Sequence, residues 1–121
     1  MKKILIVEDN EDNLDLMVQL LEDCYVLKIA ADGLQALESV RKDQPDLILM
    51  DMALPKLNGW EATRQIKSDP ATQHIPVIGV SSHAMREDEE RARLAGCDEY
   101  LTKPLDEISL FHLIEKYLGE P

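Results

Sequence analysis

Leu47-Ile48-Leu49-Met50-Asp51 is a short apolar run that stops on a carboxylate. Three other short runs also stop on polar side chains, and those side chains are Glu8 with Asp9, Ser81, and Lys103. Short apolar runs bounded by turn signals are typical of buried parallel strands. Because ligands bind beyond the carboxyl ends of such strands, the pattern predicts one rim with carboxylates, a hydroxyl and an ammonium group.

Stretches with helical spacing lie between the runs, so strand and helix alternate along the chain. This alternation predicts an α/β fold with a parallel sheet and right-handed crossovers. The second run, residues 26–30, carries Lys28, and the fifth is short and mixed, so we expect both at the sheet edges. The remaining runs then lie centrally, which favours a flavodoxin-like (βα)5 doubly wound sheet with strand order 2-1-3-4-5.

Cap signals and apolar spacing locate the helices. Asp32 and Asn58, each followed by glycine, are expected to open the second and third helices. The spacing of Leu34, Leu37 and Val40 predicts a weak apolar stripe that faces the core.

The bulk composition limits the classes of function. A chain of 121 residues is expected to form one domain, residues 1–121. The net charge of -11 argues against a nucleic-acid partner and against docking on anionic lipid. No stretch is long and apolar enough to span a membrane. Cys24 and Cys97 lie far apart with no metal-ligand spacing, so we expect free thiols and a cytoplasmic location.

The predicted rim suits a metal ion and a phosphoryl group. Crowded carboxylates at Glu8, Asp9 and Asp51 repel one another and call for a cation, and oxygen ligands without histidine or thiolate suit Mg²⁺. Lys103 would supply positive charge to a phosphate oxygen, and Ser81 would donate a hydrogen bond to another. Asp51 is the best candidate for a nucleophilic carboxylate that becomes an aspartyl-phosphate, because it ends the central strand.

Each of these residues also has a simpler interpretation. Residues 8–13 could cap a helix without any metal, and capping is about as probable as metal binding for that segment alone. Asp51 could be an ordinary loop residue, Lys103 a solvated lysine, Ser81 a helix cap, and Tyr100 a packed aromatic on an edge strand. The functional interpretation rests on all the run ends meeting at one rim.

Four segments resemble the receiver domain of two-component response regulators, in order and with receiver-like spacing over essentially the whole chain. The matching segments are residues 4–10, 51–59, 80–84 and 95–104. The resemblance implies that Asp51 is the phosphoacceptor and that Asp9 and Asp51 bind Mg²⁺ directly. It also implies that Glu8 acts through water and that the backbone carbonyl of Ala53 is a further ligand.

The resemblance assigns the remaining site residues as well. Ser81 matches the switch hydroxyl, Lys103 matches the lysine that pairs with the phosphoryl group, and its bond to Pro104 is typically cis. Tyr100 matches the aromatic residue that turns inward when the hydroxyl moves. The positions that tune dephosphorylation are Ala53 and His83, and Ala53 cannot orient a water molecule. Ser82 departs from the usual alanine or glycine.

The resemblance further implies a switch and not a turnover enzyme, one that catalyses only its own phosphorylation and dephosphorylation. A histidine kinase or phosphotransfer protein would donate the phosphoryl group. A downstream protein would then bind the face formed by the fourth helix, fifth strand and fifth helix. We expect a stand-alone regulator that is a monomer or weak dimer; the alternative is a fragment of a larger regulator with a missing effector domain.

Three other classes remain as alternatives. A Mg²⁺-dependent phosphohydrolase of the haloacid-dehalogenase type needs a second aspartate two residues after the nucleophile, where this chain has Ala53. A flavin-binding module would share the fold, but the acid-rich loops lack a phosphate cradle. A degenerate receiver used only for docking normally loses the acids or the lysine, and all are present here.

Overall fold

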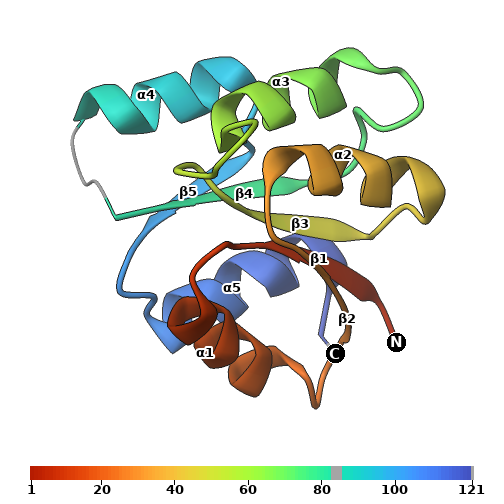
Figure 1. Ribbon diagram of the computed structural model, residues 1–121. Coiled ribbons are helices and arrows are strands. Elements are labelled where there is room, and N and C mark those ends of the chain that lie inside the picture. The colour runs from red at the N-terminus through yellow and green to blue at the C-terminus, as the bar shows by residue number, and fades with distance from the viewer. Residues whose placement is uncertain (83–85, 121) are drawn as a thin grey trace.

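The computed structural model of the chain describes residues 1–82 and 86–120. Within these ranges strands and helices alternate as predicted (Figure 1). The strands are β1 (Lys3–Val7), β2 (Val26–Ala30), β3 (Leu47–Asp51), β4 (Val77–Ser81) and β5 (Glu99–Thr102). The helices are α1 (Glu11–Leu21), α2 (Gly33–Lys42), α3 (Gly59–Ser68), α4 (Arg86–Ala95) and α5 (Glu107–Leu118).

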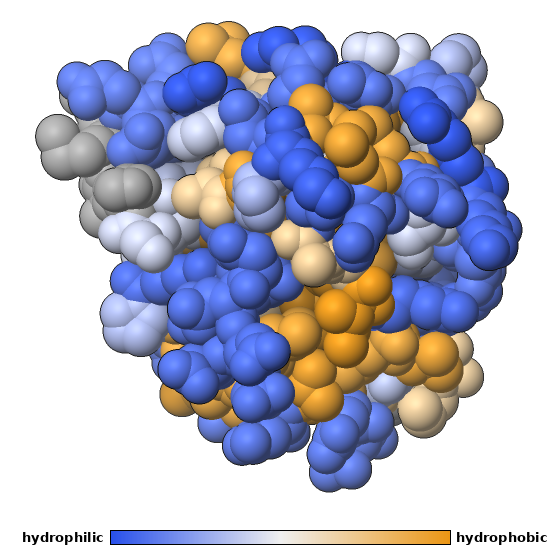
Figure 2. Space-filling view, in the orientation of Figure 1, coloured by the Kyte–Doolittle hydropathy of each residue, from blue (hydrophilic) through white to orange (hydrophobic). Residues whose placement is uncertain are grey.

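The strands pair in parallel in the order β2-β1-β3-β4-β5, which confirms the predicted order and the flavodoxin-like doubly wound fold. β2 and β5 lie at the two edges, as the lysine and the mixed composition of these runs indicated. Hydrophobic residues gather over the β2 edge in Figure 2, where Ile29 is 53% exposed. Most of the remaining surface in that view is hydrophilic, in keeping with the charged composition.

Helices cover both faces of the sheet, with α2, α3 and α4 on one face and α1 and α5 on the other (Figure 1). Successive strand residues point to opposite faces, so each strand contributes to both cores. Leu5 and Val7 pack on the side of α2 and α3, and Ile4 and Ile6 pack on the side of α1 and α5. Burial on both faces explains why the central strands are continuously apolar.

The predicted helix starts are confirmed, because the side chains of Asp32 and Asn58 accept hydrogen bonds from the backbone N–H groups of Gln35 and Glu61. The predicted core stripe of α2 is wrong at one position. Leu37 and Val40 are buried, but Leu34 is 53% exposed. Leu34 lies in the first turn of α2, and its side chain lies on the solvent side of the helix.

Among the described residues, no helix is both long and apolar enough to cross a membrane.

Candidate functional site

The strand register brings the predicted polar ends to one rim. Val7 pairs with Met50, Asp51 pairs with Val80, and Ser81 pairs with Thr102, so the central strands end at nearly the same level. The residues that follow β1, β3, β4 and β5 therefore surround one small area. This is the rim that the ends of the apolar runs predicted.

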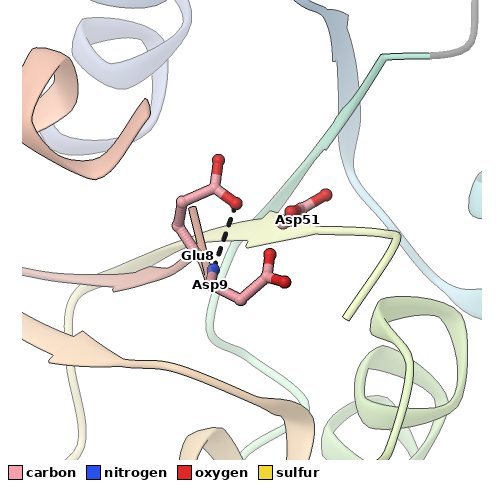
Figure 3. Close-up of side chains that lie close together, drawn as sticks. All are labelled: Glu8, Asp9 and Asp51. Carbon is pink, nitrogen blue, oxygen red and sulfur yellow. Dashed lines mark hydrogen bonds between the residues drawn. The ribbon is translucent and has the colours of Figure 1, made fainter. Parts of the chain in front are cut away.

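Three carboxylates from two strand ends lie together at this rim (Figure 3). Glu8 and Asp9 follow β1 and Asp51 ends β3, and one oxygen from each lies within 4.8 Å of the others. Glu8 is 1% exposed and Asp51 is 4% exposed, whereas Asp9 is open to solvent. The backbone N–H of Asp9 donates to Glu8 Oε2 at 3.2 Å. Glu8 and Asp51 are thus shielded from water while their carboxylates stay close together.

Lys103 reaches this cluster from the end of β5. Its Nζ lies 2.7 Å from Glu8 Oε1 and 3.4 Å from Asp51 Oδ2. The Lys103 side chain is 13% exposed, so both ion pairs are largely shielded from water. The bond between Lys103 and Pro104 is cis, as the resemblance implied. Among the described residues, Lys103 is the one cation paired with this cluster of three acids, so negative charge is in excess there.

Burial and charge together shift the protonation of these groups. Burial, followed by the adjacent Glu8 carboxylate, raises the pKa of Asp51 to about 7. Burial also acts to raise the pKa of Glu8, but its hydrogen bonds to Asp51 and Lys103 outweigh this and lower that pKa below the ordinary value. The pKa of Lys103 is raised: burial opposes its charge, but the two carboxylates more than compensate. A proton is therefore shared near Asp51, and a cation could replace it.

The donor set fits Mg²⁺. All three clustered side chains offer carboxylate oxygen, the ligand type that Mg²⁺ prefers, and the cluster contains neither imidazole nor thiolate. The loop after β3 stays close to the site, because the backbone N–H of Ala53 donates to Asp51 Oδ1 at 3.1 Å. Ala53 is exposed, and its methyl group has no hydrogen-bonding atom to position water.

Ser81 and Tyr100 lie outside the carboxylate cluster. Ser81 is buried at the end of β4, and its carbonyl accepts the backbone N–H of Lys103 at 2.7 Å. Tyr100 is half-buried on β5 and packs against the core beneath α2 and α3. It lines a cavity of about 170 Å³ between α4 and β5, together with Arg93 and Cys97. Ser82 is exposed, and the prediction for His83 lies outside the described residues.

Gly33 and Gly59 allow close backbone contacts beside the site. The sequence predicted them only as residues that follow helix caps. A Cβ atom on Gly59 would lie 2.2 Å from the backbone oxygen of Asp51, and one on Gly33 would lie 2.1 Å from that of Leu57. The N–H of Gly59 also donates to the carbonyl of Met52 at 3.0 Å. α3 can therefore start against the end of β3 only if its first residue lacks a side chain. The Asn-Gly and Asp-Gly pairs were the only signals of these contacts in the sequence.

Comparison with known proteins identifies the protein family of the chain. The response regulator receiver domain family matches residues 4–115. The chain belongs to this family and is a two-component response regulator, a class of signalling switch whose members are phosphorylated on an aspartate.

One relative and two solved structures show this similarity over nearly the whole chain. The polar-differentiation response regulator DivK of Brucella anthropi is 44% identical over 120 residues, which are 98% of each chain. The receiver domain of sensor histidine kinase PA1611 from Pseudomonas aeruginosa, solved with a magnesium ion in its active-site cleft, is 34% identical with a TM-score of 0.90 over 98% of each chain. A co-crystal structure of the Saccharomyces cerevisiae phosphotransfer protein Ypd1 with the receiver domain of Ssk1 also matches. That match is 28% identical with a TM-score of 0.88, over 96% of this chain and 88% of the other.

Proposed function

We propose that Asp51 is the phosphoacceptor of this response regulator and that Glu8, Asp9 and Asp51, with the carbonyl of Ala53, hold Mg²⁺. The observation that carries this proposal is the cluster itself. Its three carboxylates lie within 4.8 Å of one another at the ends of β1 and β3, next to the largely buried Lys103. The magnesium-bound receiver of PA1611 supports the choice of metal.

Asp51 acts as the nucleophile. One of its carboxylate oxygens forms a bond to phosphorus while the bond between phosphorus and the donor's nitrogen breaks, and the electron pair of that bond leaves with the donor. Asp51 must be ionised to attack, so its proton has to leave first. Bound Mg²⁺ supplies positive charge that favours the ionised carboxylate and offsets the charge of the phosphoryl group.

Lys103 and Ser81 respond to the new charge. The phosphoryl group places oxygens beyond Asp51, where the Lys103 ammonium, 3.4 Å from Asp51 Oδ2, can exchange Glu8 for a phosphate oxygen. Ser81 follows by donating its hydroxyl hydrogen to another phosphate oxygen. Tyr100 then turns toward the space next to β4, and the face formed by α4, β5 and α5 changes shape. The phosphoryl contacts bias an equilibrium between two states.

The partners follow from the chemistry of this switch. A histidine kinase or phosphotransfer protein supplies the phosphoryl group, as the complex of Ypd1 with the Ssk1 receiver suggests by analogy. A downstream protein binds the altered face. Residues 1–121 act as one receiver domain in the cytoplasm, as a monomer or weak dimer, and the chain catalyses only its own phosphorylation and dephosphorylation.

Phosphorylation by a small donor tests the acceptor assignment. Incubation with acetyl phosphate and Mg²⁺ should add one phosphoryl group to the wild-type protein, as intact-mass spectrometry would detect. Asp51→Asn should remove this gain in mass, whereas Asp43→Asn, which changes the C-cap residue of α2 beside the start of β1, should leave it unchanged. Equal labelling of wild-type protein and Asp51→Asn would rule out Asp51 as the acceptor.

A further inference from the structure

Trp60 and Arg91 form a contact that joins α3 to α4. The guanidinium carbon of Arg91 lies 4.0 Å from the centroid of the Trp60 ring, which is within the range of a cation–π interaction. The indole N–H is buried and has no hydrogen-bond partner among the described residues. The ring is therefore held by packing and by the stacked cation, not by a hydrogen bond.

Trp60 is closely coupled to the acceptor strand. It directly follows Gly59, whose N–H donates to the carbonyl of Met52 and whose Cα lies against the backbone oxygen of Asp51. Because a Cβ at Gly59 would overlap that oxygen, the first turn of α3 is fixed relative to the end of β3. The indole ring thus provides a fixed surface near the phosphorylation site.

Arg91 belongs to a helix with little other anchorage. Within residues 87–95, the fully buried apolar side chains of α4 are Ala92 and Ala95, and Leu94 is 78% exposed. Alanine buries a single methyl group, so these contacts hold α4 weakly. α4 begins at Arg86, five residues after Ser81 along the chain. The stack on the Trp60 ring therefore adds a side-chain contact to a helix whose buried apolar contacts are small and whose start lies close in sequence to the switch hydroxyl.

We propose that the Arg91–Trp60 stack is a latch that holds α4 in its unphosphorylated position, and that both residues are positioning residues for the switch. The proposal rests on the function proposed above for Asp51 and Ser81. The structure represents the unphosphorylated arrangement, because Lys103 is engaged with Glu8 at 2.7 Å. A contact made in one state and weakened in the other stabilises the first state, so its loss shifts the population toward the second.

Titration of the full chain with beryllofluoride and Mg²⁺, a non-covalent mimic of the phosphoryl group, tests this latch by calorimetry. Arg91→Ala should bind beryllofluoride about threefold more tightly than wild type, which corresponds to about 0.7 kcal/mol because 1.4 kcal/mol is a tenfold change. Arg91→Lys should stay near the wild-type affinity because it keeps a cation over the ring. Arg93→Ala is the matched control, since Arg93 lies on the same helix and pairs with Glu90 at 3.6 Å.

Fluorescence gives a second readout, because Trp60 is the single tryptophan of the chain. Beryllofluoride should shift the emission of the wild-type protein. Arg91→Ala should show an emission shifted part of the way before any ligand is added, because a threefold change in affinity is a partial shift of the population. Beryllofluoride should then change the emission of the variant less than it changes that of the wild type, whereas a stack with a structural role alone would leave the beryllofluoride-induced change as large as in the wild type.

The latch is overturned if folded Arg91→Ala binds beryllofluoride with wild-type affinity or more weakly, or if Arg91→Lys behaves as Arg91→Ala does. Failure of the proposed function would look different. In that case beryllofluoride would bind neither wild type nor Arg91→Ala, or would bind Asp51→Asn as well as wild type. Either of those results would also overturn the stack as a bias on the switch, even if its loss changed the resting emission.

Discussion

The charged side chains at the two rims of the sheet differ in how fully they are paired. At the amino-terminal rim, Lys67 Nζ lies 2.9 Å from Asp98 Oδ2 and donates to the carbonyl of Ile75 at 2.6 Å. Asp98 Oδ2 also accepts the backbone N–H of Val77 at 2.8 Å. At the carboxyl-terminal rim, oxygens of Glu8, Asp9 and Asp51 lie within 4.8 Å of one another, and Glu8 and Asp51 share Lys103.

The difference separates a structural cluster from a reactive one. Each charge near Lys67 has an opposite partner and satisfied hydrogen bonds, which favours a single stable arrangement. The acids near Asp51 outnumber the cation, and burial with the Glu8 charge raises the pKa of Asp51 to about 7. Their excess negative charge would favour the binding of a metal ion at this rim, and three variants or conditions can test the contrast.

The largest expected effect is that of Lys103→Met. Loss of the ammonium leaves the buried Glu8 carboxylate without its cation, and breaking a buried pair typically costs about 3 kcal/mol. Chemical denaturation without Mg²⁺ should show this loss of stability, and Mg²⁺ should restore part of it. Unchanged stability in the absence of Mg²⁺ would mean that the ion pair does not hold the cluster together.

The matched change at the amino-terminal rim is Lys67→Met. It should destabilise the fold by about 2 kcal/mol, because the Ile75 carbonyl and the Asp98 carboxylate lose the Lys67 ammonium as a hydrogen-bond donor. Its Mg²⁺ affinity, measured by calorimetry, should equal that of the wild type. A fall in Mg²⁺ affinity beyond experimental error would show that the two rims are not independent.

The third effect is the pH dependence of Mg²⁺ binding. The folded-state pKa of Asp51 is raised from 3.8 to about 7, so the folded protein holds a proton there across this window. Without Mg²⁺, Asp51 therefore makes the fold less stable as pH rises through the window. Mg²⁺ must displace the proton, so its affinity should fall by up to about tenfold per pH unit below 7 and level off above it.

Calorimetry with Mg²⁺ between pH 5.5 and 8 measures this dependence. Asp51→Asn is the control, because a neutral amide has no proton to displace and its weaker binding should lose the steep dependence near pH 7. A wild-type affinity that is flat from pH 5.5 to 8 would contradict the shifted pKa.

The sequence was sufficient to predict the sheet order and the composition of the reactive rim. Central strands buried on both faces must be apolar, and the exception of Lys28 in β2 identified an edge. The strand ends then placed Glu8, Asp9 and Asp51 together, because parallel strands that pair in register end at one level.

Other features depend on three-dimensional packing and left no clear periodic signal. Leu34 has the spacing of a core residue but lies on the solvent side of α2 and is exposed. The fit of Gly59 against the Asp51 backbone requires the exact approach of α3 to β3. The stack of Arg91 on Trp60 joins residues on two helices, and a charged residue on an acidic helix ordinarily suggests a solvated side chain.

The central claim is that excess negative charge at one rim leaves Asp51 poised to bind a cation and accept a phosphoryl group. A carbon-13 NMR titration of the aspartate carboxyl groups in Mg²⁺-free protein tests it most directly, with Asp51→Asn to assign the resonance. We predict a midpoint near pH 7 for Asp51, and loss of that titration when Mg²⁺ is saturating. A midpoint near the ordinary value of 3.8 in the Mg²⁺-free protein would contradict the claim.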